Sequence, residues 1–256
     1  MYQVDLNSDL GESFGHYRIG MDDRIIPLIS SANVACGFHA SDPVVMMNTI
    51  ELVKGAGCNI GAHPGFPDLM GFGRRNMSLT ADEIKAYTLY QISALAGMCS
   101  ARGLSLQHVK PHGAMYNMAA KDYEMSKAIC EAVAEFDPGL IILGLSGSET
   151  IRAAKDCGLK TALEVFADRA YEEDGSLVDR RKPGAVIRDE QEAIERVIRM
   201  VKEGKVAAVT GKDIPIRADS VCVHGDGEKA LLFVEKIKKA LSEEGIEIRP
   251  LREICG

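Results

Sequence analysis

Acidic and amide residues alternate along the first apolar run of the sequence. Asp5, Asn7 and Asp9 are two positions apart, and Glu12 follows just beyond them. Successive side chains of a strand point to opposite faces, so the first three residues should share one face. Several polar side chains on one face of a buried strand are costly unless they bind something. The spacing therefore predicts a functional site at the exit of this strand.

Polar residues follow five later apolar runs in the same way. They are Asn33, His39 and Asp42; His63 and Asp68; Lys110, His112, Tyr116 and Asn117; Glu164, Asp168 and Arg169; and His224 and Asp226. Four of the six histidines stand where an apolar run stops. In parallel α/β folds this edge of the sheet is where ligands bind. We expect these clusters to form one active site.

Such residue types support acid–base or metal chemistry. A carboxylate and histidines that lie close together can transfer protons, or they can hold a metal. Asp5, His39 and His63 would suit zinc with one position left to water. No HExxH pair is present, so a bound divalent metal stays an open alternative. Lys110 could stabilise a developing oxyanion or hold a substrate carboxylate, with His112 as proton donor.

We therefore divide the candidates by expected role. The catalytic candidates are Asp5, Asp9, His39, His63, Lys110 and His112, with Asp5 or Asp9 as the base. The substrate-binding candidates are Asn7, Glu12, Asn33, Asp168, Arg169, His224 and Asp226. Arginines such as Arg169 and Arg181 can clamp a carboxylate or phosphate with two parallel hydrogen bonds.

Nucleotide-binding signals are weak. Gly211-Lys212 is followed by Asp213, and Val206 stands where the first glycine of a GxxxxGK[ST] loop belongs. Residues 225–230 show a GxGxxA spacing whose amides could cradle an anion at a helix start. This motif lies too near the end of the chain to supply the following βαβ unit of a dinucleotide fold.

The elements that must position these residues alternate along the chain. Predicted strands are 3–7, 31–36, 58–62, 106–110, 140–145, 161–166, a weaker 206–209, and 220–224. Predicted helices are 43–55, 80–102, 121–135, 148–157, 189–203 and 228–243. Repeated strand–helix units imply a parallel sheet, and seven or eight of them can close a barrel. Without a linker or an internal repeat, residues 1–256 are expected to form a single domain.

Composition limits the class of protein. The formal net charge is −7, and 46% of the 256 residues are hydrophobic. This balance argues against nucleic acid or an anionic membrane as a partner. No apolar run reaches the ~18 residues of a membrane span, and no signal peptide is visible. Seven cysteines without a CxxC pair fit a reducing compartment, so we expect a cytoplasmic protein.

Several motifs resemble the LamB/YcsF family. They are residues 5–12 (DLNSDLGE), 31–39 (SANVACGFH), 61–68 (GAHPGFPD), 71–75 (GFGRR), 109–117 (VKPHGAMYN), 164–169 (EVFADR) and 223–226 (VHGD). They occur in order over essentially the whole chain. The resemblance implies an irregular (β/α) barrel of about seven parallel strands, similar to the glycoside hydrolase/deacetylase barrel.

The resemblance also implies an activity. It is the hydrolysis of a small cyclic amide, the lactam of 5-oxo-L-proline (pyroglutamate), to L-glutamate. The reaction requires ATP with Mg²⁺ and two partner subunits, B and C. Because no standard phosphate-binding loop is visible, we expect the nucleotide to be handled partly or wholly by those partners.

Two alternatives remain. One is a metal-dependent deacetylase or amidohydrolase that acts on a sugar or another amide, which metal analysis would distinguish. The other is a non-catalytic subunit that binds substrate for a partner, although the density of acid–base residues argues against it.

Overall fold

Seven parallel strands close into a barrel in the computed structural model, which describes residues 2–223 and 228–255. In order around the barrel they are β1 (Tyr2–Leu10), β2 (Ser31–Ala35), β3 (Asn59–His63), β4 (His108–Val109), β5 (Ile141–Leu145), β6 (Lys160–Phe166) and β9 (Ser220–Cys222). The pairing of β9 with both β6 and β1 closes the ring. The predicted barrel of about seven parallel strands is confirmed.

One predicted strand lies outside the barrel. Residues 206–209 were expected to form a weak parallel strand, but β7 (Lys205–Ala207) pairs antiparallel with β8 (Asp213–Pro215). With only one of its three residues buried, β7 lacks the apolar character of a barrel strand. A further strand, β10 (Ile246–Ile248), was not predicted and pairs with the first residues of β1.

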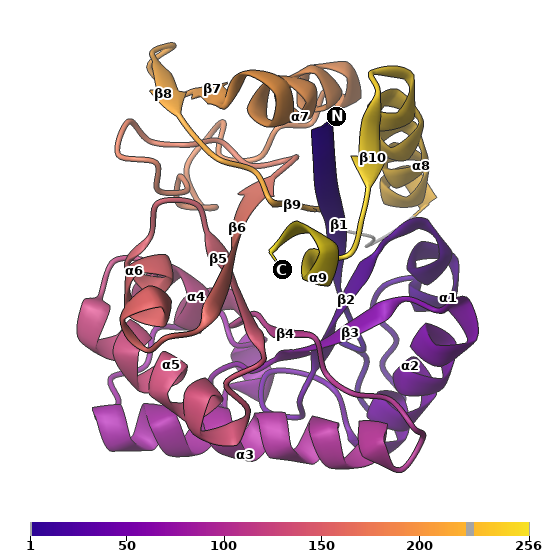
Figure 1. The fold of residues 1–256 in the computed structure, drawn as a ribbon, viewed down its shortest axis with the longest axis vertical. Coiled ribbons are helices and arrows are strands. Elements are labelled where there is room, and N and C mark those ends of the chain that lie inside the picture. Colours follow the sequence, from indigo (N-terminus) through magenta and orange to yellow (C-terminus); the bar gives the residue numbers. More distant parts are fainter. Residues whose placement is uncertain (1, 224–227, 256) are drawn as a thin grey trace.

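Helices surround the strands (Figure 1). They are α1 (Asp22–Ile25), α2 (Pro43–Ala56), α3 (Ala81–Ser100), α4 (Gly113–Ala119), α5 (Tyr123–Phe136), α6 (Glu149–Asp156), α7 (Glu190–Glu203), α8 (Glu228–Glu243) and α9 (Leu251–Ile254), with short 3₁₀ turns at Ile26–Leu28 and Leu69–Gly71. Side-chain caps fix the starts of two of these helices. Asp42 caps α2, and Thr80 and Glu83 form a reciprocal capping box on α3. No helix within residues 2–223 and 228–255 has the length and apolar character needed to cross a bilayer.

The two faces of the barrel strands have different surroundings. Val4, Leu6 and Leu10 of β1 belong to the main apolar core, which also contains helix residues such as Ile50 and Ile92. The alternate residues of β1 face the barrel interior. Apolar packing thus lies mainly between strands and helices, which leaves the interior available for polar side chains.

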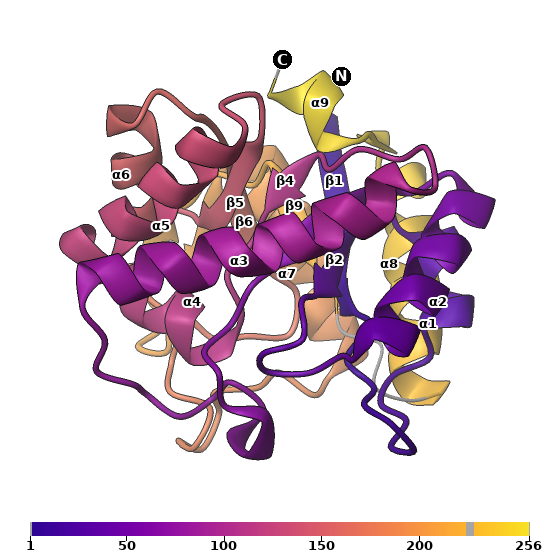
Figure 2. The same cartoon turned by 90° about the horizontal axis from the view of Figure 1, so that it is seen from below.

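The two ends of the barrel differ. Leu251 of α9 packs against Ile141, Leu143 and Ala162 of β5 and β6. Figure 2 shows α9 at one end of the barrel, and the loops that follow β1, β3 and β6 at the opposite end. Because all the barrel strands run in one direction, those loops gather at one mouth, as in other parallel barrels.

Candidate active site

Asp5 lies deepest in the polar interior. Its Oδ1 accepts hydrogen bonds of 2.6 Å from the hydroxyls of both Ser30 and Ser31, and its Oδ2 accepts one from Ser220. Burial raises the pKa of Asp5 to about 6, although the three hydroxyls oppose this shift. Three serine hydroxyls thus enclose Asp5, which is fully buried, whereas Asp9 and Glu12 keep 15% and 11% of their side chains exposed.

Two amides and a histidine form the next level. The Asn33 side chain donates to Asn7 Oδ1 and Asp9 Oδ1, both at 2.8 Å. Nε2 of His108 donates to Asn33 Oδ1 at 2.7 Å. Burial lowers the pKa of His108 to about 3, and nearby Lys110 lowers it further in the same direction. Asn7 and Asn33, proposed as substrate ligands, are fully buried here and are bonded to protein groups.

Lys110 neutralises the acidic groups above this level. Its Nζ lies 2.9 Å from Asp9 Oδ1, 2.7 Å from Glu164 Oε1 and 3.2 Å from Asn7 Oδ1. Burial alone would lower the pKa of Lys110, but Asp9 and Glu164 raise it well above its usual value. The Tyr116 hydroxyl donates to Glu164 Oε2 at 2.7 Å. Lys110 Nζ also lies 3.3 Å from Cys222 Sγ, so the three donors of the ammonium are shared among four close partners.

Glu12, His39, His63 and His112 converge at the mouth of the barrel. One ligand-type atom from each lies within 4.8 Å of the others, and all four residues are buried. His39 and His112 stack with ring centroids 3.7 Å apart. Burial, reinforced by the neighbouring histidines, lowers the pKa of both rings well below 6.5. Both imidazoles are therefore neutral at neutral pH, the form that accepts a proton or binds a metal.

Glycines allow the backbone to approach these rings. A Cβ added to Gly65 would lie 2.6 Å from His39 Nδ1. One added to Gly73, where φ is +61°, would lie 2.6 Å from His39 Cβ and 2.9 Å from His112 Cδ2. The segments 61–68 and 71–75 thus pack against the rings of His39 and His112. This close packing explains why the long loop after β3 is rich in glycine.

The remaining candidates have different surroundings. Arg169, which follows β6, is buried and donates to the Val178 carbonyl at 2.6 Å. Burial lowers its pKa to about 10, and Arg180 contributes to that shift. Asp168 is half-buried beside it. His224 and Asp226 lie outside the described residues.

Sequence reasoning grouped some of these residues differently. The suggested zinc ligands were Asp5, His39 and His63, whereas the structure gathers His39 and His63 with Glu12 and His112. Glu164, Tyr116 and His108 were absent from the set of chosen candidates. His108 stands two residues before Lys110, so strand alternation would have placed it on the same face.

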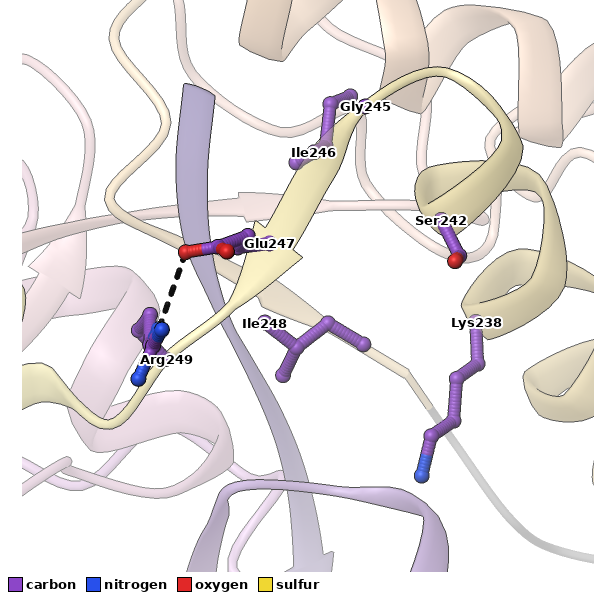
Figure 3. Close-up of a pocket in the computed structure, with 7 residues that line it drawn as sticks. All are labelled: Lys238, Ser242, Gly245, Ile246, Glu247, Ile248 and Arg249. Carbon is purple, nitrogen blue, oxygen red and sulfur yellow. Dashed lines mark hydrogen bonds and ion pairs between the residues drawn. The ribbon is translucent and has the colours of Figure 1, made fainter. Parts of the chain in front are cut away.

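A separate groove of about 460 Å³ lies between α8 and β10 (Figure 3). Its lining residues are Lys238, Ser242, Gly245, Ile246, Glu247, Ile248 and Arg249. The Glu247 carboxylate pairs with Arg249 at 3.2 Å, as the dashed line in Figure 3 shows. This groove offers neither histidine nor cysteine, so we assign the chemistry to the barrel mouth.

Known proteins resemble this chain over nearly its full length. The A subunit of 5-oxoprolinase from Clostridium beijerinckii is 64% identical over 254 residues, covering 99% of this chain and 100% of the relative. The corresponding protein from Pyrococcus abyssi is 54% identical with the same coverage. The crystal structure of a lactam utilization protein from Thermus thermophilus has a TM-score of 0.91 and 47% identity, covering 96% of this chain and 99% of that one.

The fold extends to more distant proteins. A T48 deacetylase structure has a TM-score of 0.50 at 14% identity, which shows a shared barrel fold and nothing further. The LamB/YcsF family model matches residues 4–256. With that match and relatives this similar, the chain belongs to the LamB/YcsF family.

Proposed function

We propose that this chain is the A subunit of an ATP-dependent 5-oxoprolinase. It would hydrolyse the lactam of 5-oxo-L-proline to L-glutamate together with subunits B and C. The observation that carries the proposal is the 64% identity, over the whole length of the relative, to a protein named as the A subunit of 5-oxoprolinase. The name of the Thermus protein, a lactam utilization protein, supports the same substrate class.

The chemistry explains the need for ATP. A lactam carbonyl is stabilised by amide resonance, so unassisted attack by water has a high barrier. Phosphorylation of the lactam oxygen by ATP, with Mg²⁺, creates a better electrophile. Water can then add and the C–N bond breaks, which frees the amine and leaves an acyl phosphate; a second water cleaves this acyl phosphate to glutamate and inorganic phosphate. In the described part of the chain we recognise no standard nucleotide loop, so we assign phosphoryl transfer to the partner subunits.

The barrel mouth offers groups for the hydrolytic step. Asp9 keeps 15% of its side chain exposed, against 2% for Lys110 and none for Glu164. Its Oδ2 lies 3.4 Å from His63 Nε2. We assign Asp9 as the general base, because it is the carboxylate of this network with access to water. Lys110 pairs with Asp9, and since its ammonium already has four close partners it acts as a positioning residue unless substrate displaces one contact.

Other roles expected from the sequence remain part of this proposal. His39, His63 and His112 would orient water or the tetrahedral intermediate, and the buried guanidinium of Arg169 would attract the substrate carboxylate. Burial and the neighbouring histidines hold the pKa of His112 well below 6.5, so the ring would have to take up a proton before acting as the proton donor expected from the sequence. Asp5, Asn7 and Asn33 would support these groups from below. The proposed location is the cytoplasm.

One observation favours a second function. The buried group of one glutamate and three histidines is also suited to metal-dependent hydrolysis of an amide without ATP. These two functions differ in their requirement for nucleotide and partners.

Glutamate release distinguishes them. It would be measured for this chain alone, for the B–C pair alone and for all three subunits, each with and without ATP and Mg²⁺. We expect release only from the three-subunit mixture with ATP. Asp9→Asn should abolish it, while Asp82→Asn, an exposed acid in the first turn of α3, should leave it unchanged. ATP-independent release by the single chain would instead establish the amidohydrolase function.

A further inference from the structure

We propose that Glu12, His39, His63 and His112 bind one divalent transition-metal ion at the mouth of the barrel. The inference concerns metal binding itself and does not depend on which amide the protein hydrolyses. Three observations support it. They are the ring nitrogens that must carry hydrogen in two histidines, the distances between the four ligand atoms, and the packing of the backbone around them.

The ring nitrogens of His63 and His112 that carry no hydrogen point toward each other. His63 Nδ1 lies 2.7 Å from the Lys110 carbonyl, and His112 Nε2 lies 2.9 Å from the Phe72 carbonyl. A carbonyl only accepts, so each of these nitrogens must carry the hydrogen. The other nitrogens, His63 Nε2 and His112 Nδ1, lie 3.0 Å apart. In neutral rings both are acceptors, and two acceptors this close require a cation between or beside them.

Further donors make a metal a better occupant than a proton. A shared proton needs two acceptors, whereas four ligand atoms converge here. Glu12 Oε1 lies 3.3 Å from His112 Nδ1 and 3.1 Å from His39 Nε2. Metal–ligand bonds of about 2.1 Å in a tetrahedron place neighbouring ligands about 3.4 Å apart. Three of the distances between these atoms, 3.0 to 3.3 Å, are close to that value, and all four ligand atoms lie within 4.8 Å of one another.

The surroundings hold the ligands in place. The hydrogen bonds of His63 and His112 to backbone carbonyls are the outer contacts that metal-binding histidines usually make. Gly65 and Gly73 pack against the His39 ring so closely that a methyl group would collide with it. The rings are thus oriented by backbone rather than by flexible side chains.

The donor set indicates which metal binds. Three imidazoles and one carboxylate suit zinc and similar transition metals, whereas Mg²⁺ and Ca²⁺ prefer oxygen ligands. Asp9 Oδ2, 3.4 Å from His63 Nε2, stands close enough to interact with a metal-bound water. We therefore infer zinc as the best match.

Metal content tests the site without any assay of activity. The chain would be stripped with a chelator and reloaded with ZnCl₂, and bound zinc and its affinity would be measured by elemental analysis and calorimetry. We expect one zinc ion per chain. His63→Ala and Glu12→Gln should each weaken binding at least tenfold, because loss of a hydrogen-bonding partner behind a ligand already costs about 10–100-fold.

Controls separate this site from other zinc-binding groups. His16→Ala removes an exposed histidine and should leave affinity unchanged. The chain also has seven free cysteines. Co²⁺ loading should therefore give visible ligand-field bands without the intense near-ultraviolet absorption of cobalt–thiolate bonds. Circular dichroism would confirm folding, and the conservative Glu12→Gln provides the test if His63→Ala does not fold.

Two results would overturn the proposal. One is a well-folded, reloaded chain that binds far less than one zinc ion. The other is equal zinc affinity in wild type, Glu12→Gln and His112→Gln. Failure of the three-subunit mixture to open pyroglutamate would refute the proposed function and leave this inference intact.

Discussion

Nζ of Lys110 lies 2.7 Å from Oε1 of Glu164, and neither side chain has more than 2% of its surface exposed. The same ammonium contacts Asp9 at 2.9 Å. One positive charge thus balances two carboxylates where solvent is nearly excluded. Such a group stabilises the fold only while all of its members are present, because an unpaired buried charge is very costly.

Lys110→Met should therefore destabilise the chain strongly. We expect a loss of about 3–5 kcal/mol in the free energy of unfolding, together with loss of glutamate release by the three-subunit mixture. Denaturant unfolding measures the first quantity. Lys85→Met, which breaks the surface pair of Lys85 with Glu135, should have little effect on the free energy of unfolding.

The double variant Lys110→Met/Glu164→Gln tests the cause of that loss. It should be more stable than Lys110→Met alone, because the second change removes a carboxylate left without its cation. If the double variant is less stable than the single one, charge pairing is not the main contribution of Lys110.

Asp5 should make stability depend on pH in a particular direction. Its pKa is about 6 in the folded chain and 3.8 as a model value. Between these values the folded state binds more proton, so the contribution of Asp5 to stability falls as pH rises. The stability of Asp5→Asn relative to wild type should therefore increase by about 2 kcal/mol between pH 4 and pH 7.

Denaturant unfolding at several pH values measures this difference. Groups that titrate in both proteins, including the buried histidines, cancel in the comparison. Asp82→Asn, an exposed change, should show a difference from wild type that is nearly independent of pH. A flat difference for Asp5→Asn would mean that the Asp5 carboxyl is not penalised by burial.

Gly61→Ala should destabilise the barrel because His108 fills the space beside it. An added Cβ would lie 2.2 Å from His108 Nε2, so the ring must move and lose its hydrogen bond to Asn33. Overpacking of this kind typically costs about 1–3 kcal/mol. Gly97→Ala is the matched control, since its Cβ would meet nothing within 4 Å inside α3. It should stabilise the chain by about 0.5–1 kcal/mol. Thermal unfolding should show a lower melting temperature than wild type for Gly61→Ala and a higher one for Gly97→Ala.

Gly73→Ala should disturb the imidazoles more than the fold. Gly73 and Gly15 both have positive φ, +61° and +54°, so alanine is strained at either position. Only at Gly73 would the new Cβ press on His39 and His112. We expect backbone strain in both variants, a larger loss of stability in Gly73→Ala because of the added clash, and a loss of zinc affinity in Gly73→Ala alone. Calorimetry with ZnCl₂ measures this, and equal affinities in the two variants would show that the glycine does not position the rings.

Local signals in the sequence determined most of the elements. Apolar runs marked the seven barrel strands, because a strand-like run is a property of neighbouring residues. Alternation also placed Asp5, Asn7 and Asp9 together on one face. The ends of the other apolar runs located the remaining polar residues, and the family motifs identified the LamB/YcsF relationship.

Tertiary structure decided which side chains meet. Barrel closure aligns Asp5 with Ser220 and brings Lys110 to Glu164, pairs separated by 215 and 54 positions in the chain. Residues 205–207 carry a strand-like pattern, but their pairing with β8 excluded them from the ring. Tertiary structure also explains why the candidate metal group contains Glu12 and His112 in place of Asp5, which was expected from the sequence. Side-chain alternation specifies a face, whereas depth within a barrel depends on the register of strands that are distant in sequence.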